Sequence, residues 1–164
     1  GIRCTGVEIQ SDMAEMSRRS IALNGLEEMC DIINAPLQSL PSTVPAGCAT
    51  VVVSNPPYRA KESGFETDNR AIRLARHEVA VTFGEVASVA AYLLGTKGRF
   101  YIVHRTERMA EIMAECSRLR LEPKILQTLV PALGKPPHLF LLKCVKDARR
   151  GLAVLPERAV DTWV

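Results

Sequence analysis

The chain has 164 residues, of which 47% are hydrophobic and 24% charged, with a formal net charge of +3. These values are typical of a globular protein with one core, so we expect a single domain over residues 1–164. No apolar run approaches the roughly eighteen residues that cross a bilayer, and no leader peptide pattern opens the chain, so we expect a cytoplasmic protein without membrane partners.

The five cysteines are scattered along the chain. They are Cys4, Cys30, Cys48, Cys116 and Cys144. None forms a CxxC pair or stands at ligand spacing from a histidine, so we expect reduced, mostly buried thiols and no metal site.

Strand and helix patterns alternate along the chain. Strands are expected at residues 2–9, 30–34, 49–54 and 98–104, and helices at 12–24, 69–77, 82–95 and 106–119. Ser11 or Asp12 is expected to cap the first helix, Thr82 and Glu85 form a capping-box pattern, and Thr106 is expected to cap the last helix. Residues 35–47 and 59–68 are predicted loops. Two strand-like runs, 123–130 and 138–145, precede a basic tail from about residue 146.

This alternation predicts βαβ units and a mostly parallel sheet, with the last two strands forming an antiparallel hairpin at one edge. In such sheets, ligands bind at the carboxyl ends of the strands. That rule places Glu8, after the first visible strand, and Asn55, after the third, on the same rim. The chain begins at Gly1 already inside a strand pattern, so we expect a fragment whose beginning is missing.

Glu8 stands where a nucleoside ribose is held in dinucleotide folds, because a carboxylate there accepts hydrogen bonds from both sugar hydroxyls. Taken alone, an acidic residue at a strand end is more often an ordinary surface residue.

The stretch "TVVVSNPPYRA" predicts a strand buried on both faces that ends in a rigid tetrapeptide, Asn55-Pro56-Pro57-Tyr58. The Asn55 side-chain oxygen and the Pro56 carbonyl oxygen could each accept one N–H from a conjugated amine. These two bonds favour the localised lone pair that the nitrogen needs for attack. Tyr58 could stack on the ring that bears the amine. The alternative is a plain turn after a strand.

Basic side chains near this tetrapeptide suit the phosphates of a nucleic acid. The candidates for RNA contact are Lys61, Arg70, Arg73, Arg76, His77 and Arg105. A solvated helix face, balanced by Glu62, Glu66 and Asp68, explains the basic helix equally well.

Together, Glu8 and Asn55-Pro56-Pro57-Tyr58 resemble the S-adenosylmethionine-dependent amino-methyltransferases with an (Asn/Asp)-Pro-Pro-aromatic motif. Further stretches, "AIRLARHEVAVTFGEV", "GRFYIVHRTERMAEIM" and "GKPPHLFLLKCVKDARRGLAVLPE", are similar to the bacterial tRNA1(Val) (adenine-37-N6)-methyltransferase family. The likeness covers most of the chain.

This resemblance implies a Rossmann-like class I methyltransferase fold, S-adenosylmethionine as cofactor and a tRNA anticodon-loop adenine as substrate. It implies catalytic roles for Asn55, Pro56, Pro57 and Tyr58. Cofactor contacts are implied for Glu8, Ile9, Leu37 and Asn55.

The sequence departs from the family in two places. The family's first strand and glycine-rich loop are missing, so the fragment itself is expected to lack part of the cofactor pocket. Where the family has an acidic residue near the cofactor adenine, this chain reads Asn34-Ala35-Pro36-Leu37. Adenine contact would then fall to backbone groups and apolar packing.

Two other functions remain open. Release-factor methyltransferases, which methylate a protein glutamine at N5, share the tetrapeptide, and a non-catalytic RNA-binding module would also explain the basic residues. The sequence leaves the oligomeric state open.

Overall fold

The computed structural model describes residues 1–56 and 81–160. They fall into two compact units, Gly1–Val44 and Pro45–Val164. The predicted loop at 59–68 and the predicted helix at 69–77 lie outside the described residues.

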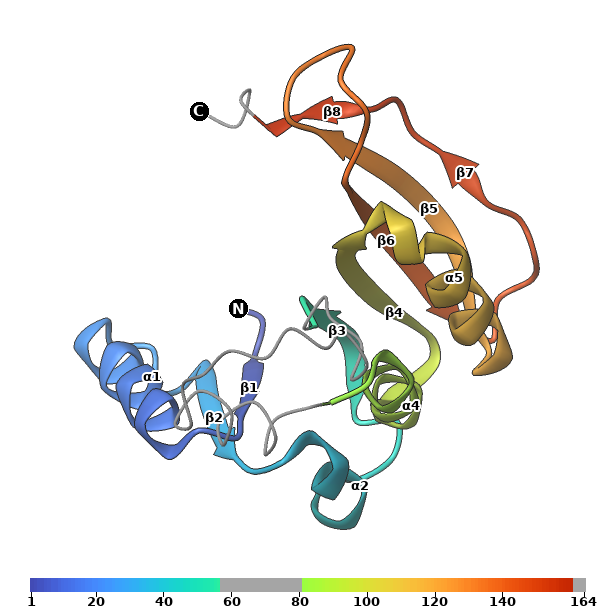
Figure 1. Ribbon diagram of the computed structural model, residues 1–164. Helices are drawn as coiled ribbons and strands as arrows, with labels where there is room; N and C mark the ends of the chain where they lie inside the picture. The colour runs from blue at the N-terminus through green and yellow to red at the C-terminus, as the bar shows by residue number, and fades with distance from the viewer. Residues whose placement is uncertain (57–80, 161–164) are drawn as a thin grey trace, which may run out of the picture. The chain divides into compact units, whose positions relative to one another are not determined.

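The first unit is a parallel pair of strands with one long helix (Figure 1). Its elements are β1 (Cys4–Glu8), α1 (Ser11–Leu23), β2 (Cys30–Asn34), the 3-10 turn η1 (Leu37–Ser39) and α2 (Leu40–Thr43). The parallel register runs from Cys4 opposite Cys30 to Glu8 opposite Asn34. Helix α1 ends at Leu23, with Asn24 as its C-cap and Gly25 next at φ +63°, so the predicted Asn-Gly stop is confirmed.

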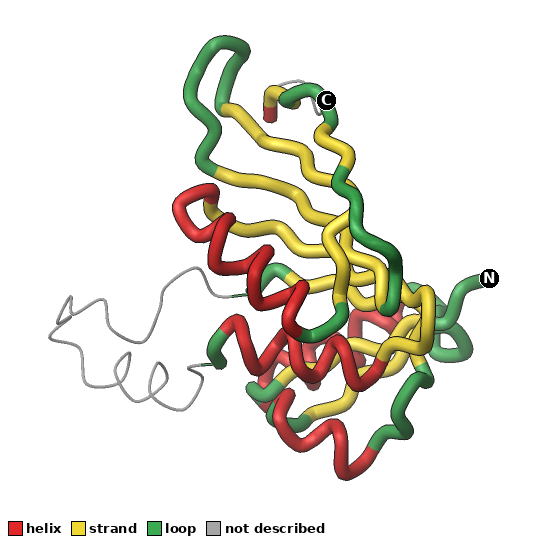
Figure 2. The backbone as a smooth tube through the Cα atoms, turned by 90° about the vertical axis from the view of Figure 1, so that its right-hand side faces the viewer, coloured by secondary structure: helices red, strands yellow, loops and turns green. Residues whose placement is uncertain are grey.

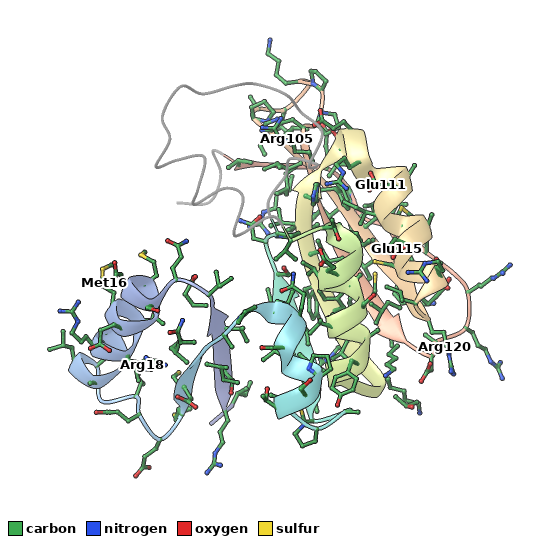
Figure 3. The ribbon with its side chains drawn as sticks, turned by 60° about the horizontal axis from the view of Figure 1, so that its bottom comes forward. Met16, Arg18, Arg105, Glu111, Glu115 and Arg120 are labelled. Carbon is green, nitrogen blue, oxygen red and sulfur yellow. The ribbon has the colours of Figure 1, made fainter. Side chains whose placement is uncertain are left out.

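Helix α1 packs against this strand pair through a buried alanine and through side-chain hydrogen bonds to β2. Ala14 is fully buried. The guanidinium of Arg18 reaches from the helix to β2, where Nη2 donates to the Ile32 carbonyl oxygen at 3.0 Å (Figure 3). The small side chain of Ala14 lets the helix approach closely, and Arg18 satisfies a strand carbonyl.

The second unit contains a mixed sheet with helices. Its elements are β3 (Ala49–Ser54), α4 (Phe83–Leu93), β4 (Leu94–Arg105), η2 (Thr106–Arg108), α5 (Met109–Arg118), β5 (Leu121–Val130), β6 (Leu139–Lys146), β7 (Ala153–Val154) and β8 (Arg158–Ala159). The strand order is β3-β4-β6-β5-β7, and β8 also pairs with β5. Strands β3 and β4 are parallel, whereas β6 is antiparallel to both β4 and β5. The predicted antiparallel hairpin is therefore confirmed, and its loop extends beyond the strand ends (Figure 2).

Helices α4 and α5 contact each other and lie against one face of this sheet (Figure 1). The side chains beneath them alternate along the strands: Phe100 pairs with Cys144 and Ile102 with Leu142, and all four are at most 2% exposed. Burying an aliphatic or aromatic side chain of this size contributes about 1.5–3 kcal/mol. This face is the core of the second unit.

Two segments expected to be irregular form regular structure. The predicted loop at 35–47 contains η1 and the short helix α2, where Pro41 sits in the first turn and needs no N–H partner there. The basic tail contains β7 and β8, both paired with β5. Strands of two residues are too short to show an alternating pattern in the sequence. They form here because they pair with β5, which is distant in the sequence.

Two of the three predicted helix caps are wrong. Gln10 occupies the N-cap of α1 without a side-chain hydrogen bond, and Ser11 donates to Asn34 Oδ1 instead. Thr106 Oγ1 donates to the Pro137 carbonyl oxygen at 3.0 Å. In both cases the hydroxyl donates its hydrogen bond to a residue that is distant in the sequence, and not to the start of its own helix.

The cysteine prediction is only partly right. Cys116 and Cys144 are buried, whereas Cys4 and Cys48 are exposed and Cys30 is half-buried. The two buried thiols belong to the core of the second unit. Within the described residues, no helix has the length and apolar character needed to span a membrane.

Candidate functional site

Asn55 follows β3 at the carboxyl edge of the second unit's sheet. Ser54, the last residue of β3, pairs with Ile102 of the parallel strand β4. Asn55 is exposed, whereas the next residue, Pro56, is buried. The proline ring restricts the backbone there, so the Asn55 amide is presented to solvent from a rigid position. Pro57 and Tyr58 lie outside the described residues. The described half of the tetrapeptide is thus at the edge where parallel sheets bind ligands.

Five of the six residues expected to contact RNA lie outside the described residues. They are Lys61, Arg70, Arg73, Arg76 and His77. The sixth, Arg105, ends β4 (Figure 3). Because β3 and β4 are parallel, Arg105 lies on the same edge of the sheet as Asn55. Its Nη1 is 3.8 Å from Glu107 Oε1, and the two side chains are 51% and 68% exposed. An ion pair this exposed contributes at most about 1 kcal/mol, so it would give way readily to a polyanion.

Glu8 ends β1 in the first unit and is half-buried. Its Oε1 accepts a hydrogen bond from the Gln10 backbone N–H at 2.8 Å. Among residues 1–56 and 81–160, this is the one hydrogen bond that Glu8's carboxylate accepts. The bond holds one oxygen in place, and the acceptor positions that remain fit a diol such as a ribose.

Asn34 lies opposite Glu8 at the end of β2 and binds the segment that follows β1. Its Nδ2 donates to the Glu8 carbonyl oxygen at 2.8 Å and to the Ile9 carbonyl oxygen at 3.2 Å. Its Oδ1 accepts from Ser11 Oγ at 3.2 Å. Sequence reasoning noted Asn34 only as a departure from the family pattern and missed this role, since the partners are 23 to 26 residues away.

The remaining cofactor candidates also lie on the carboxyl side of the first unit. Ile9 directly follows β1, and Leu37 opens η1 after β2; both are half-buried. Ile9 is next to Glu8 in the sequence, and Leu37 follows Asn34 by three residues. Their half-buried apolar side chains could pack against the adenine ring of a nucleoside. The described structure therefore brings Glu8 and Ile9 together with Asn34, and it places Asn55 and Arg105 on one edge of the second unit.

His104 is the one polar or charged residue among the described residues that is fully buried. Its Nδ1 accepts the Arg105 backbone N–H at 2.8 Å, and its ring meets Phe83 edge-on at 6.2 Å between centroids. Burial, followed by the positive charge of Arg108, lowers the pKa of His104. These contacts describe a neutral histidine of the core.

A hollow of about 410 Å³ lies on the second unit's sheet. Its lining includes Val53, Tyr101, Val103 and Leu141, which alternate with the side chains packed under the helices. Asn55 lines one end. The prediction that β3 is buried on both faces is wrong, because Val53 is 74% exposed.

No family model matches this chain. The chain is 26% identical over 141 residues to a tRNA1(Val) (adenine(37)-N6)-methyltransferase of Aeromonas hydrophila subsp. hydrophila. The alignment covers 86% of this chain and 57% of that relative, so the chain spans little more than half of the relative's length.

Solved structures with much lower identity share the fold. A predicted O-methyltransferase from Agrobacterium tumefaciens matches with a TM-score of 0.71 at 20% identity, over 94% of this chain and 67% of that one. A geranyl diphosphate C-methyltransferase from Streptomyces coelicolor A3(2) matches with a TM-score of 0.65 at 12% identity, over 89% and 63%. The chain has the class I methyltransferase fold.

The class I methyltransferase fold is thus shared with proteins named for methylation at oxygen and at carbon. A fold of this kind does not decide the atom that is methylated.

Proposed function

We propose that the protein transfers a methyl group from S-adenosylmethionine to the exocyclic N6 of an adenine in a tRNA anticodon loop. One observation carries this proposal: Asn55, the first residue of Asn-Pro-Pro-Tyr, is displayed at the carboxyl end of β3. The likeness to a tRNA adenine-N6 methyltransferase supports adenine 37 of a valine tRNA as the target. We also propose that residues 1–164 belong to one catalytic domain.

The first unit has groups that fit the cofactor. S-adenosylmethionine supplies an electrophilic methyl group. The Glu8 carboxylate would accept hydrogen bonds from the ribose hydroxyls, and the half-buried side chains of Ile9 and Leu37 would pack against the adenine. The carboxylate bond to Gln10 N keeps Glu8 in place before the cofactor arrives.

Asn55 and Pro56 would act on the target amine. The adenine N6 lone pair is delocalised into the ring and is a weak nucleophile. When Asn55 Oδ1 and the Pro56 carbonyl oxygen accept its two N–H groups, the lone pair localises on nitrogen, and this stabilisation is largest in the transition state. The nitrogen would then attack the methyl group that the cofactor supplies, with the sulfur as leaving group, and would lose one proton to solvent. Tyr58 would stack on the base and Pro57 would stiffen the tetrapeptide.

The tRNA would be held by cations on the rim. Arg105 is on the same edge as Asn55, and the net charge of +3 favours a polyanion. Lys61, Arg70, Arg73, Arg76 and His77 complete the proposed RNA-contacting set. Substrate and enzyme would meet in the bacterial cytoplasm, where tRNA is modified.

The test is a methylation assay with radiolabelled S-adenosylmethionine on the full-length protein. We expect label in unmodified valine tRNA at N6 of adenine 37, and none in a protein that carries a Gly-Gly-Gln loop. Label in the protein instead of the tRNA would indicate a glutamine methyltransferase. Tight tRNA binding that is indifferent to S-adenosylmethionine, without any labelled product, would indicate a non-catalytic RNA-binding module.

A further inference from the structure

Asn34 connects the ends of the two strands in the first unit. It is the last residue of β2 and lies opposite Glu8, the last residue of β1. Through Nδ2 it donates to the carbonyl oxygens of Glu8 and Ile9, at 2.8 and 3.2 Å. The Ala35 backbone N–H donates to the same Glu8 oxygen at 3.2 Å. The Glu8 carbonyl oxygen thus accepts from two donors at the end of β2, the Asn34 side chain and the Ala35 backbone N–H.

The segment that Asn34 holds is short. Only Ile9 and Gln10 separate β1 from α1. Gln10 N donates to the Glu8 carboxylate, and Ser11 Oγ donates back to Asn34 Oδ1. Asn34 thus binds the backbone on both sides of Gln10, at Ile9 through its carbonyl oxygen and at Ser11 through its side chain. Gln10 in turn donates to the Glu8 carboxylate, so Asn34 fixes the short segment that holds this carboxylate. Groups fixed before binding lose less entropy when the ligand arrives.

We propose that Asn34 is a positioning residue for ribose recognition, acting through Glu8. This inference rests on the proposed function, in which Glu8 accepts hydrogen bonds from the ribose. An amide suits the position better than a carboxylate, because both carbonyl oxygens need a donor and an ionised carboxylate has none. An aspartate here would face the two carbonyl oxygens with a negative charge.

The experiment measures how well the full-length protein distinguishes S-adenosylhomocysteine from its 2′-deoxy analogue by calorimetry. The ratio of the two Kd values reports hydroxyl recognition. Both ligands are measured on the same preparation, so the ratio does not depend on the fraction of folded protein. For the unmodified protein we expect the analogue to bind on the order of tenfold more weakly.

Asn34→Ala and Asn34→Asp should both bring this ratio close to one, although neither changes a group that touches the ligand. Arg18→Gln is the matched control. It removes the bond to the Ile32 carbonyl oxygen on the same strand, away from Glu8, and should keep the ratio of the unmodified protein. In a Glu8→Gln background, Asn34→Ala should have little further effect, because the two residues act in series.

Three outcomes separate the possibilities. If both Asn34 variants keep the ratio of the unmodified protein, Asn34 has no part in ribose recognition. If Asn34→Ala lowers affinity equally with and without Glu8→Gln, it acts independently of Glu8, and the inference is also wrong. If the unmodified protein binds neither ligand, the proposed function itself fails.

Discussion

Thr82 and Glu85 bind each other reciprocally at the start of α4. The Glu85 backbone N–H donates to Thr82 Oγ1 at 3.3 Å, and the Thr82 backbone N–H donates to Glu85 Oε2 at 2.7 Å. This capping box satisfies two backbone donors at the helix start. It fixes the start of a helix whose Phe83, Val86 and Ala90 are buried in the core.

Thr82→Ala should lower the free energy of unfolding by about 0.5–2 kcal/mol, because the N3 backbone donor loses its acceptor. Urea denaturation followed by circular dichroism measures the change. Thr82→Ser retains the hydroxyl and should recover most of the loss. Equal stability of all three proteins would mean that the capping box contributes nothing.

Asn55→Ala should act on the chemical step in the full-length protein. Losing one preorganised acceptor at the amine should lower kcat roughly a hundredfold or more. Asn55→Asp keeps an acceptor oxygen and should retain a measurable part of the activity, since related enzymes with this motif use either residue. Single-turnover rates on unmodified valine tRNA measure both.

Cofactor affinity is the control for Asn55. Both variants should bind S-adenosylmethionine about as well as the unmodified protein, because Glu8, and not Asn55, is expected to make most of the cofactor contact. An alanine variant that methylates at a near-normal rate would contradict the proposed role of Asn55.

Glu8→Ala should weaken S-adenosylmethionine binding by on the order of 1–3 kcal/mol, the effect of losing a charged acceptor with two partners. Isothermal titration calorimetry on the full-length protein measures it. Glu15→Ala, which removes an exposed carboxylate from α1, is the control and should leave the affinity unchanged. Unchanged affinity of the Glu8 variant would remove Glu8 from the cofactor site.

His104 should make stability depend on pH. Burial and the charge of Arg108 hold its pKa below the ordinary value of 6.5, and the Arg105 N–H occupies Nδ1. The folded chain therefore binds fewer protons than the unfolded chain below this pH. The stabilisation is complete above about pH 6.5 and falls as the pH drops through the lower folded-state pKa.

His104→Phe keeps a ring against Phe83 and cannot titrate. Its free energy of unfolding should change less than that of the unmodified protein between pH 6.5 and about pH 5, as measured by urea denaturation at each pH. Identical pH profiles of the two proteins would exclude His104 as the source of the dependence.

The exposed face of β3 should promote self-association of the 164-residue chain. Val53 is 74% exposed beside the hollow, whose lining is mostly apolar. Exposed apolar patches favour association. Sedimentation velocity should show association that Val53→Lys reduces, without loss of stability at so exposed a site. A monomeric chain with a sharp, cooperative melt would contradict this prediction.

The sequence by itself determined most of the local elements and the positions of Glu8 and Asn55 at strand ends. The helical and strand periods predicted strands β1 to β6 and helices α1, α4 and α5, and Thr82-x-x-Glu85 predicted the start of α4, because these signals depend on neighbours within a few residues. The rule that parallel strands bind ligands at their carboxyl ends placed Glu8 and Asn55 at strand ends, where the structure has them.

Only the tertiary structure decided which hydrogen-bond partners the polar side chains have. Ser11 and Thr106 resemble helix caps in sequence, yet they donate to Asn34 and Pro137, more than twenty residues away. The tail strands β7 and β8 exist because β5 offers them an edge. Asn34 likewise reaches the Glu8 carbonyl oxygen only because β1 and β2 pair. A hydrogen bond between distant segments depends on how those segments pack together, and a pattern of neighbouring residues does not predict that packing.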